Sequence, residues 1–265
     1  MPRARNISRR PSERVGVLYE DDAVMALDKP PGLAAVPVPG VRKSSAWSLL
    51  TEHLGANRQR AFTVHRIDRF TSGVLLFAKT PRDRDTLVEQ FLAHTPEREY
   101  LAVVRGRLEE KRGTLVHYFR RRGPHGMHQE PCHESERGAA RAELDYRVEK
   151  ALRGASLVRV ALVTGLQNQI RAQFAAIGHP VIGDRKYRPE EKEERRIDRV
   201  ALHAAHLTFE HPRTGELISV NAPPPRDFAN LIHSLSYPTT DAARDGVPKS
   251  PPPKSPQNKL SIRVK

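Results

Sequence analysis

Residues 64–80, with the sequence VHRIDRFTSGVLLFAKT, constrain this chain more than any other segment. Asp68 stands between two arginines, a Thr71-Ser72-Gly73 turn follows, and residues 74–78 are all apolar. An apolar run of this kind is typical of a buried strand. The pattern predicts a carboxylate that is fixed on a tight turn, supported by that strand and surrounded by positive charge. Such a carboxylate could serve as a nucleophile or a base toward a polyanion.

The charge of the chain indicates the kind of partner. Its 265 residues include 45 Lys and Arg against 31 Asp and Glu, which gives a net charge of +14. An excess of this size favours nucleic acid as the partner. Cys132 is the only cysteine, so no disulfide can form within the chain, and a reducing, cytoplasmic location is expected. No apolar run is long enough to span a bilayer, so no membrane association is predicted.

The chain is predicted to hold one folded domain between two tails. Residues 1–14 are rich in arginine and are predicted to form a disordered basic arm. Residues 238–265 are rich in Pro, Ser and Lys and contain too few apolar residues to fold. The folded domain is therefore expected to span residues 15–237, which is long enough for a substantial hydrophobic core.

This domain is predicted to be α+β, with a largely antiparallel mixed sheet flanked by helices. Many strand patterns and few helical ones favour this class over a doubly wound sheet. Strands are expected at residues 15–19, 24–28, 98–104, 142–148 and 157–163, with a hairpin that joins 207–210 to 216–221. Helices are expected at residues 45–54, from the capping residue Thr80 onward, and at 168–177. The charged block at 190–199 is expected to be a solvated helix or insertion and not part of a site.

Residues 64–80 closely resemble the catalytic motif of the RluA-type pseudouridine synthases, H-R-L-D-x-x-T-S-G followed by an apolar strand, with Ile67 in place of leucine. Four further segments resemble other motifs of this family, in the family's order. They are KPPGL at 29–33, REYLAVVRG at 98–106, TGLQNQIRAQFAAIGHPVIGDRKY at 164–187 and RVALHAAHLTFEHPRTGELISVNAPPP at 199–225. The resemblance implies the fold of the family's catalytic domain. No separate S4 RNA-binding domain is expected, because too few residues precede residue 15.

The resemblance also implies an activity, the isomerisation of specific uridines to pseudouridine in structured RNA, either ribosomal or transfer RNA. It implies that Asp68 is the catalytic carboxylate, that Arg171 is its counter-charge, and that Tyr100 holds the uracil while it turns. Arg66 would occupy the space that the flipped-out base leaves. The residues predicted to contact RNA are Lys29, His65, Arg66, Arg69, Thr71 and Gln169. No cofactor is expected, because the isomerisation has no net redox change. A monomer is also expected.

The third motif departs from the family pattern. Leu166, Asn168 and Gln173 replace an arginine and two histidines of that pattern, and Gln167 lies among them. These changes are expected to affect substrate contacts more than the chemistry.

Two other functions remain open from the sequence. The first is a non-catalytic RNA-binding or ribosome-assembly factor with the same fold, and the intact Asp68, Tyr100 and Arg171 favour the enzyme over it. The second is a hydrolase that uses His65 and Asp68, which leaves the other motifs unexplained. A zinc site is not predicted, because the spacing of the nearby His and Cys residues matches no standard site. Those residues are His125, His128, Cys132 and His133.

Overall fold

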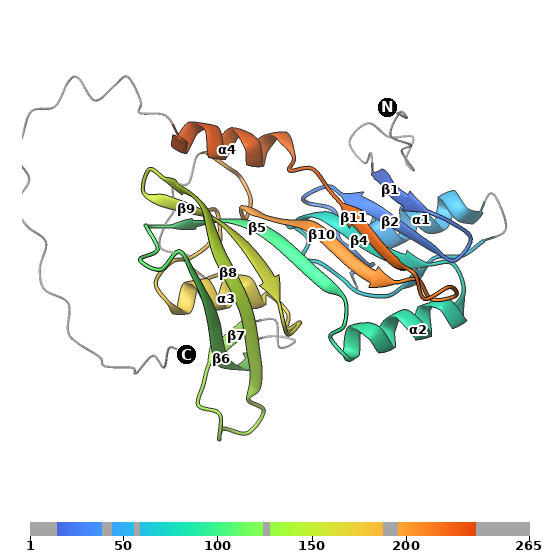
Figure 1. Ribbon diagram of the computed structural model, residues 1–265, viewed down its shortest axis with the longest axis horizontal. Coiled ribbons are helices and arrows are strands. Elements are labelled where there is room, and N and C mark those ends of the chain that lie inside the picture. The colour runs from blue at the N-terminus through green and yellow to red at the C-terminus, as the bar shows by residue number, and fades with distance from the viewer. Residues whose placement is uncertain (1–14, 39–43, 56–58, 124–127, 188–195, 237–265) are drawn as a thin grey trace, which may run out of the picture.

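The computed structural model describes residues 15–38, 44–55, 59–123, 128–187 and 196–236 (Figure 1). The two predicted disordered tails and most of the charged block at 190–199 lie outside the described residues. The described part contains eleven strands and four helices. The strands are β1 (Gly16–Glu20), β2 (Val24–Lys29), β3 (Phe62–Thr63), β4 (Ser72–Ala78), β5 (Glu97–Arg105), β6 (Arg112–Arg122), β7 (His128–Pro131), β8 (Ala140–Leu152), β9 (Ala155–Leu162), β10 (Leu202–Glu210) and β11 (Leu217–Asn221). The helices are α1 (Ala46–Gly55), α2 (Pro81–Leu92), α3 (Gln169–Ala176) and α4 (Arg226–Ser236).

One mixed sheet runs through the molecule in the order β1-β2-β4-β10-β5-β9-β8-β6-β7, with β3 on β4 and β11 on β10. Within the described residues, β4 and β10 form the one parallel pair, and all other pairs are antiparallel. The predicted α+β class is therefore confirmed. Parallel strands begin at the same edge of a sheet, so the residues that precede β4 and β10 lie close together.

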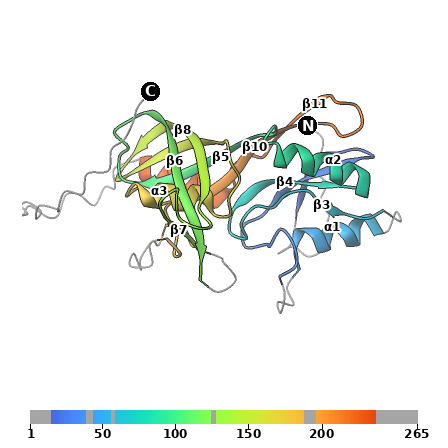
Figure 2. The ribbon, with the colours of Figure 1, turned by 90° about the horizontal axis from the view of Figure 1, so that it is seen from below.

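The buried strand predicted after Asp68 is β4, and all seven of its residues are buried. Its side chains alternate between two cores, because successive residues of a strand point to opposite faces. Leu75 and Phe77 pack with α1, whereas Val74 and Leu76 pack with Leu87 of α2. Figure 2 shows α1 and α2 on opposite sides of β4. Helices on both faces explain why the run is apolar throughout and does not alternate.

The other half of the sheet encloses the largest core cluster. Side chains of β5, β8 and β9 pack there with Ile170 and Phe174 of α3 and with Phe228, Leu231 and Leu235 of α4. Beyond this core, β6, β7 and β8 extend from the body of the molecule (Figure 1). Their side chains alternate between partly buried and exposed positions, and many arginines there pair with glutamates.

The predicted strands and helices are present, with ends shifted by at most five residues. Thr80 caps α2 as expected, since its hydroxyl accepts a hydrogen bond from the Asp83 N–H at 3.2 Å. Four elements, β3, β6, β7 and α4, were not predicted from the sequence. Charged residues interrupt the apolar pattern of β6, whereas α4 does have apolar residues at helical spacing that could have predicted it. In the part of the chain that the structure describes, no helix is both long and apolar enough to cross a membrane.

Candidate active site

The Asp68 turn connects β3 to β4 and is closed by a hydrogen bond from the Thr71 N–H to the Asp68 carbonyl at 3.0 Å. Gly73 follows with φ of +109°, and a Cβ on it would lie 2.0 Å from the Ala204 carbonyl oxygen of β10. Only glycine therefore permits the close pairing of β4 with β10. This pairing fixes where the Asp68 turn ends, and it is the physical reason for a glycine at the end of the motif.

Asp68 forms an ion pair with Arg171, as the sequence predicted. The Arg171 Nη1 lies 3.1 Å from the Asp68 Oδ2, and the two side chains are 13% and 25% exposed. Arg171 stands in the first turn of α3, so the pair joins the two halves of the molecule. The Asp68 carboxylate thus keeps an opening to solvent while one oxygen is held by a largely buried guanidinium.

Asp184 orients Arg171 and was not predicted from the sequence. Its carboxylate accepts hydrogen bonds from the Arg171 Nε at 2.7 Å and the Nη2 at 2.8 Å, and its side chain is 0% exposed. The backbone N–H groups of Lys186 and Tyr187 also donate to it. Burial alone would raise the pKa of Asp184, but the Arg171 contacts outweigh burial and lower it. The aspartate after Gly183 in the third motif was the available signal.

Arg199 holds the far side of the Asp68 turn. Its Nη1 donates to the carbonyl oxygens of Phe70 at 3.3 Å, Val200 at 3.1 Å and Leu202 at 3.2 Å. Its Nε and Nη2 bond to Asp227 of α4 at 2.6 and 2.9 Å. Arg199 is buried, so the prediction that the block at 190–199 is solvated and not part of a site is wrong at its C-terminal end.

Lys29 has a structural position and not the RNA contact that was predicted. Its side chain is fully buried, and its Nζ donates to the carbonyl oxygens of Pro30 at 3.0 Å, Leu33 at 2.8 Å and Arg69 at 3.1 Å. Burial lowers its pKa to about 7, although the nearby Asp68 charge opposes this shift. All three donors are occupied by protein carbonyls. Lys29 therefore ties the turn after β2 to the Asp68 turn.

Thr71 and Gln169 are also turned inward, which corrects their prediction as RNA contacts, whereas His65 is half-buried and its RNA contact stays a prediction. The His65 Nε2 accepts from the Leu76 N–H at 3.1 Å, and burial lowers the pKa of His65 to about 3. Thr71 is buried. Gln169 is buried as well, and its amide bonds the loop before α3 to the Glu143 carbonyl at 2.9 Å. The places of Thr71 and Gln169 in the motifs reflect local structure, because groups enclosed in this way do not face a polyanion.

Tyr100 lies on β5 and packs against the larger core cluster. Burial raises its pKa to about 12, and the negative charge of Asp68 adds to the shift while Arg98 opposes it. Tyr100 is therefore electrostatically close to Asp68. It is not among the residues that line the cavity beside Asp68. The role predicted for Tyr100 stays a prediction.

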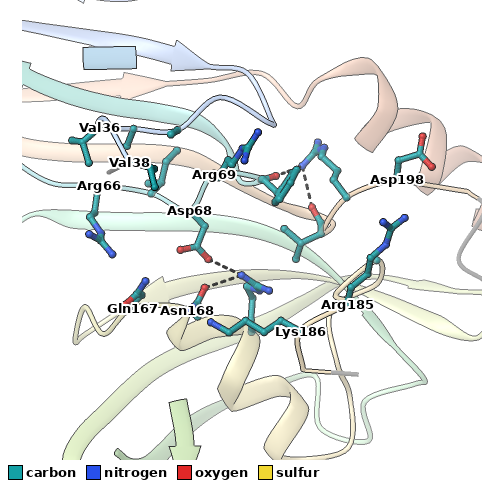
Figure 3. A pocket seen from close by; sticks show the side chains of 18 residues that line it. Val36, Val38, Arg66, Asp68, Arg69, Gln167, Asn168, Arg185, Lys186 and Asp198 are labelled. Carbon is teal, nitrogen blue, oxygen red and sulfur yellow. Dashed lines mark hydrogen bonds and ion pairs between the residues drawn. The ribbon is translucent and has the colours of Figure 1, made fainter. Parts of the chain in front are cut away.

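A cavity of about 540 Å³ opens beside Asp68. Its walls come from the turn after β2, the Asp68 turn, the start of α3 and the loops before β10. The predicted RNA contacts Arg66 and Arg69 line it and are exposed. Figure 3 shows Asp68 near its centre, with Arg66 on one side and Arg185 on the other. The cavity thus joins two carboxylates, Asp68 and Asp198, to several cationic side chains and an apolar wall, and its volume suits a small aromatic group.

The described residues contain no group of three or more His, Cys, Asp or Glu side chains that could hold a metal ion. His128 instead stacks on Tyr187 with ring centroids 4.7 Å apart, and the His133 ring bonds to Ser135. His125 lies outside the described residues.

Comparison with known proteins decides the family. The sequence profile described as RNA pseudouridylate synthase matches residues 23–176. The chain belongs to the RNA pseudouridylate synthase family. Members of this family are isomerases that form pseudouridine in RNA, and the RNA substrate and the enzyme class of this chain follow. The resemblance seen in the motifs is therefore confirmed.

Curated relatives of this synthase agree over most of its length. It is 34% identical over 241 residues to the uncharacterized RNA pseudouridine synthase YlyB of Bacillus subtilis, which covers 88% of this chain and 77% of the relative. It is also 34% identical over 210 residues to the dual-specificity RNA pseudouridine synthase RluA of Vibrio cholerae, covering 79% and 82% of the two chains. Among solved structures, human RNA pseudouridylate synthase domain containing 4 shares the fold, with a TM-score of 0.68 and 20% identity over 83% of this chain and 92% of that one.

The altered third motif lies closer to the site in this synthase than the sequence suggested. Asn168 has φ of +57°, and its Oδ1 accepts from the Arg171 Nη1 at 2.7 Å. This is the same nitrogen that contacts Asp68, so the change at 168 touches the predicted catalytic pair directly. Gln173 is buried and donates to the Leu115 carbonyl at 2.9 Å, which places that change in the core. The expectation that the departures affect mainly substrate contacts stays a prediction for Asn168, which also lines the cavity, whereas the burial of Gln173 argues against a direct substrate contact at that position.

Proposed function

We propose that Asp68 is the catalytic carboxylate of this synthase and acts on a uridine that is flipped out of the RNA into the cavity. The observation that supports this role most strongly is the Arg171–Asp68 pair, 3.1 Å long, in the wall of the cavity. Asp68 is partly exposed there, whereas the other carboxylate on Arg171, Asp184, is fully enclosed. A carboxylate that must reach a nucleotide needs this combination of a fixed position and an open side.

The reaction requires one carboxylate near the ribose and no redox partner. The bond between uracil N1 and the ribose C1′ breaks, the uracil turns, and C5 bonds to C1′. The proton on C5 is lost and one is gained at N1, so the composition does not change. A carboxylate can assist as a nucleophile or as a base. Asp68 has the position for either role, with Arg171 holding its second oxygen.

The remaining roles follow from position. Arg66 lines the cavity and is exposed, which suits entry into the space left by the flipped base. Tyr100 is proposed to hold the uracil from the β5 side, since an aromatic ring can do so without forming a bond. Arg69, Arg185 and Lys186 are proposed to bind phosphates near the opening.

The substrate is proposed to be ribosomal or transfer RNA, and the name of a relative in Nitrosomonas europaea, ribosomal large subunit pseudouridine synthase D, supports the ribosomal choice. We propose further that residues 15–237 suffice for the chemistry, and that the protein acts as a cytoplasmic monomer. All residues with a proposed role in the reaction lie between Arg66 and Lys186.

Two measurements test the proposed function. Pseudouridines are mapped in total RNA from cells with and without the gene, and an RNA fragment around any lost site then serves for single-turnover kinetics. Asp68→Asn is expected to lower the saturated rate more than about a thousandfold, or about 4 kcal/mol of barrier, because an amide is neither nucleophile nor base. RNA affinity should stay close to that of the wild type.

Asp198→Asn is the matched control, since Asp198 is an exposed acid in the wall of the same cavity. It removes the same charge and should leave the rate nearly unchanged. A rate for Asp68→Asn within about tenfold of the wild type would exclude Asp68 as the catalytic carboxylate. If the wild type binds RNA but forms no pseudouridine, a non-catalytic RNA-binding role is the better description.

A further inference from the structure

An exposed aromatic ring stands at the opening of the cavity. Phe70 lies two residues after Asp68, lines the cavity and is 49% exposed. Six large hydrophobic side chains are exposed in the described part of the chain, and Phe70 is the one aromatic residue among them. Ligand cavities are lined mainly by hydrophobic and aromatic side chains, so an exposed ring in this wall is placed to contact a bound ligand. The motif H-R-L-D-x-x-T-S-G leaves this position unspecified, so it does not explain the phenylalanine.

The backbone that supports Phe70 is fixed from both sides. The Arg199 Nη1 holds the Phe70 carbonyl at 3.3 Å, and the Lys29 Nζ holds the preceding Arg69 carbonyl at 3.1 Å. The Gly32 N–H also donates to that Arg69 carbonyl at 2.9 Å. Phe70 therefore presents its ring from a rigid turn, and little conformational entropy is lost when a ligand covers it.

One side of the ring already has a cationic partner. The Arg69 guanidinium carbon lies 5.4 Å from the centre of the Phe70 ring. Its position is set by a hydrogen bond from the Arg69 Nε to the Gly32 carbonyl at 2.8 Å. A cation near an aromatic face is attracted by the electrons of that face. Arg69 and Phe70 together present a flat apolar ring beside a positive charge. The ring is suited to a nucleobase, and the charge is suited to the phosphate next to that base.

We infer that Phe70 is a stacking site for a nucleobase adjacent to the target uridine, with Arg69 contacting the intervening phosphate. This inference rests on the proposed function, in which the target uridine enters the cavity toward Asp68. The RNA chain leaves the cavity on the 5′ and 3′ sides of the flipped nucleotide. The bases of the two adjacent nucleotides therefore lie at the opening of the cavity, where Phe70 is half exposed. Flipping a base removes stacking from its neighbours. Stacking of one neighbour on Phe70 would offset that loss.

The test uses RNA stem-loops that carry one loop uridine and the fluorescent base 2-aminopurine on its 5′ or its 3′ side. Binding to the wild type should quench the fluorescence at one of these two positions, because stacking on an aromatic ring quenches it. Phe70→Ala should abolish this quenching and weaken RNA binding about 5- to 150-fold, the range for loss of one base–aromatic stack. Phe70→Trp should retain the quenching and the RNA affinity of the wild type. Phe70→Leu, which is apolar but not aromatic, should lose both.

Leu217→Ala is the matched control, because Leu217 is 72% exposed on β11 and is not among the residues that line the cavity. It should bind the stem-loops like the wild type. Equal binding by Phe70→Ala and the wild type, or full binding by Phe70→Leu, would overturn the inference. A loss of the saturated rate with unchanged affinity would instead place Phe70 on the target uridine. These readouts concern affinity, so they are independent of whether Asp68→Asn abolishes turnover.

Discussion

Two largely buried arginines of this synthase form nearly the same ion pair with an aspartate, but they are expected to have different roles. Arg171 and Arg199 each bond to one aspartate through Nε and Nη2, at 2.6 to 2.9 Å. They differ in what the remaining nitrogen, Nη1, contacts. In Arg171 it reaches Asp68, whereas in Arg199 it reaches three backbone carbonyls, including that of Phe70.

The difference shows that one kind of ion pair can support either chemistry or architecture. Arg171 pairs with Asp68, the proposed catalytic carboxylate in the wall of the cavity, so its charge is used at the site. Arg199 acts on backbone dipoles, so it fixes the shape of the turn that presents that carboxylate. The partners differ as well, since the Asp184 side chain is 0% exposed and that of Asp227 is 42% exposed. Removal of the two pairs should therefore have unequal costs.

The largest difference is expected between Arg171→Met and Arg199→Met. Arg171→Met leaves Asp184 buried without a counter-charge, which costs about 3–5 kcal/mol of unfolding free energy, and it removes the contact to Asp68. The saturated single-turnover rate should fall at least about a hundredfold. Arg199→Met should lower the unfolding free energy by about 1–3 kcal/mol and the saturated rate by about tenfold or less. Urea unfolding and single-turnover kinetics measure the two effects, and equal rate losses would remove the distinction between the two arginines.

A smaller difference is expected when the arginines are kept and their aspartates are neutralised. Asp184→Asn should lower the saturated rate about tenfold to a hundredfold, because Arg171 loses the charge that fixes its orientation. Asp227→Asn should change the rate by less than about threefold, since water can replace an exposed partner. The matched substitutions give the same change in charge. A larger effect from Asp227 than from Asp184 would contradict the assignment of Arg171 to the site.

Asn168 gives a finer probe of the Arg171 region. Asn168→Gly keeps the left-handed backbone but removes the side-chain oxygen from the Arg171 Nη1, so the saturated rate should fall about tenfold, or about 1.4 kcal/mol. Asn168→Ala removes the same oxygen and adds backbone strain of about 1–2 kcal/mol. The two variants should thus share one rate loss and differ in unfolding free energy. A wild-type rate in Asn168→Gly would show that the amide does not position Arg171.

The smallest expected effect concerns stability in acid. The pKa values of Asp184 and Asp227 both lie below the usual 3.8, because the guanidinium contacts outweigh the opposing effect of burial. Each carboxylate therefore contributes stability that is fully present above about pH 4 and is lost as the pH falls through the lower folded value. The unfolding free energy, measured with urea between about pH 2 and 6, should depend less on pH in Asp184→Asn and Asp227→Asn than in the wild type. The reduction should be greater for Asp184→Asn, and a greater reduction for Asp227→Asn would contradict the burial argument.

The sequence by itself determined the fold class, most elements and the central pair of the site. The apolar run at 74–78 identified β4, and the capping residue Thr80 identified the start of α2. Both signals are local, since the geometry of a single element dictates where apolar and capping residues fall along it. The motif around Asp68 and the third motif predicted the Asp68–Arg171 pair, although 103 residues separate its members. The family and its activity followed from the same motifs.

Tertiary structure decided which motif residues face the cavity and which hold it together. Lys29, Thr71 and Gln169 belong to motifs typical of RNA contact, but they are enclosed in the fold, whereas Phe70, at a position that the motif leaves unspecified, is exposed. Arg199 stood at the end of a charged block and became buried only because β10 runs parallel to β4 and places it against the Asp68 turn. Burial is a property of neighbours that come from distant parts of the chain. A linear pattern can therefore name the residues at a site, but it does not give the direction in which each side chain points.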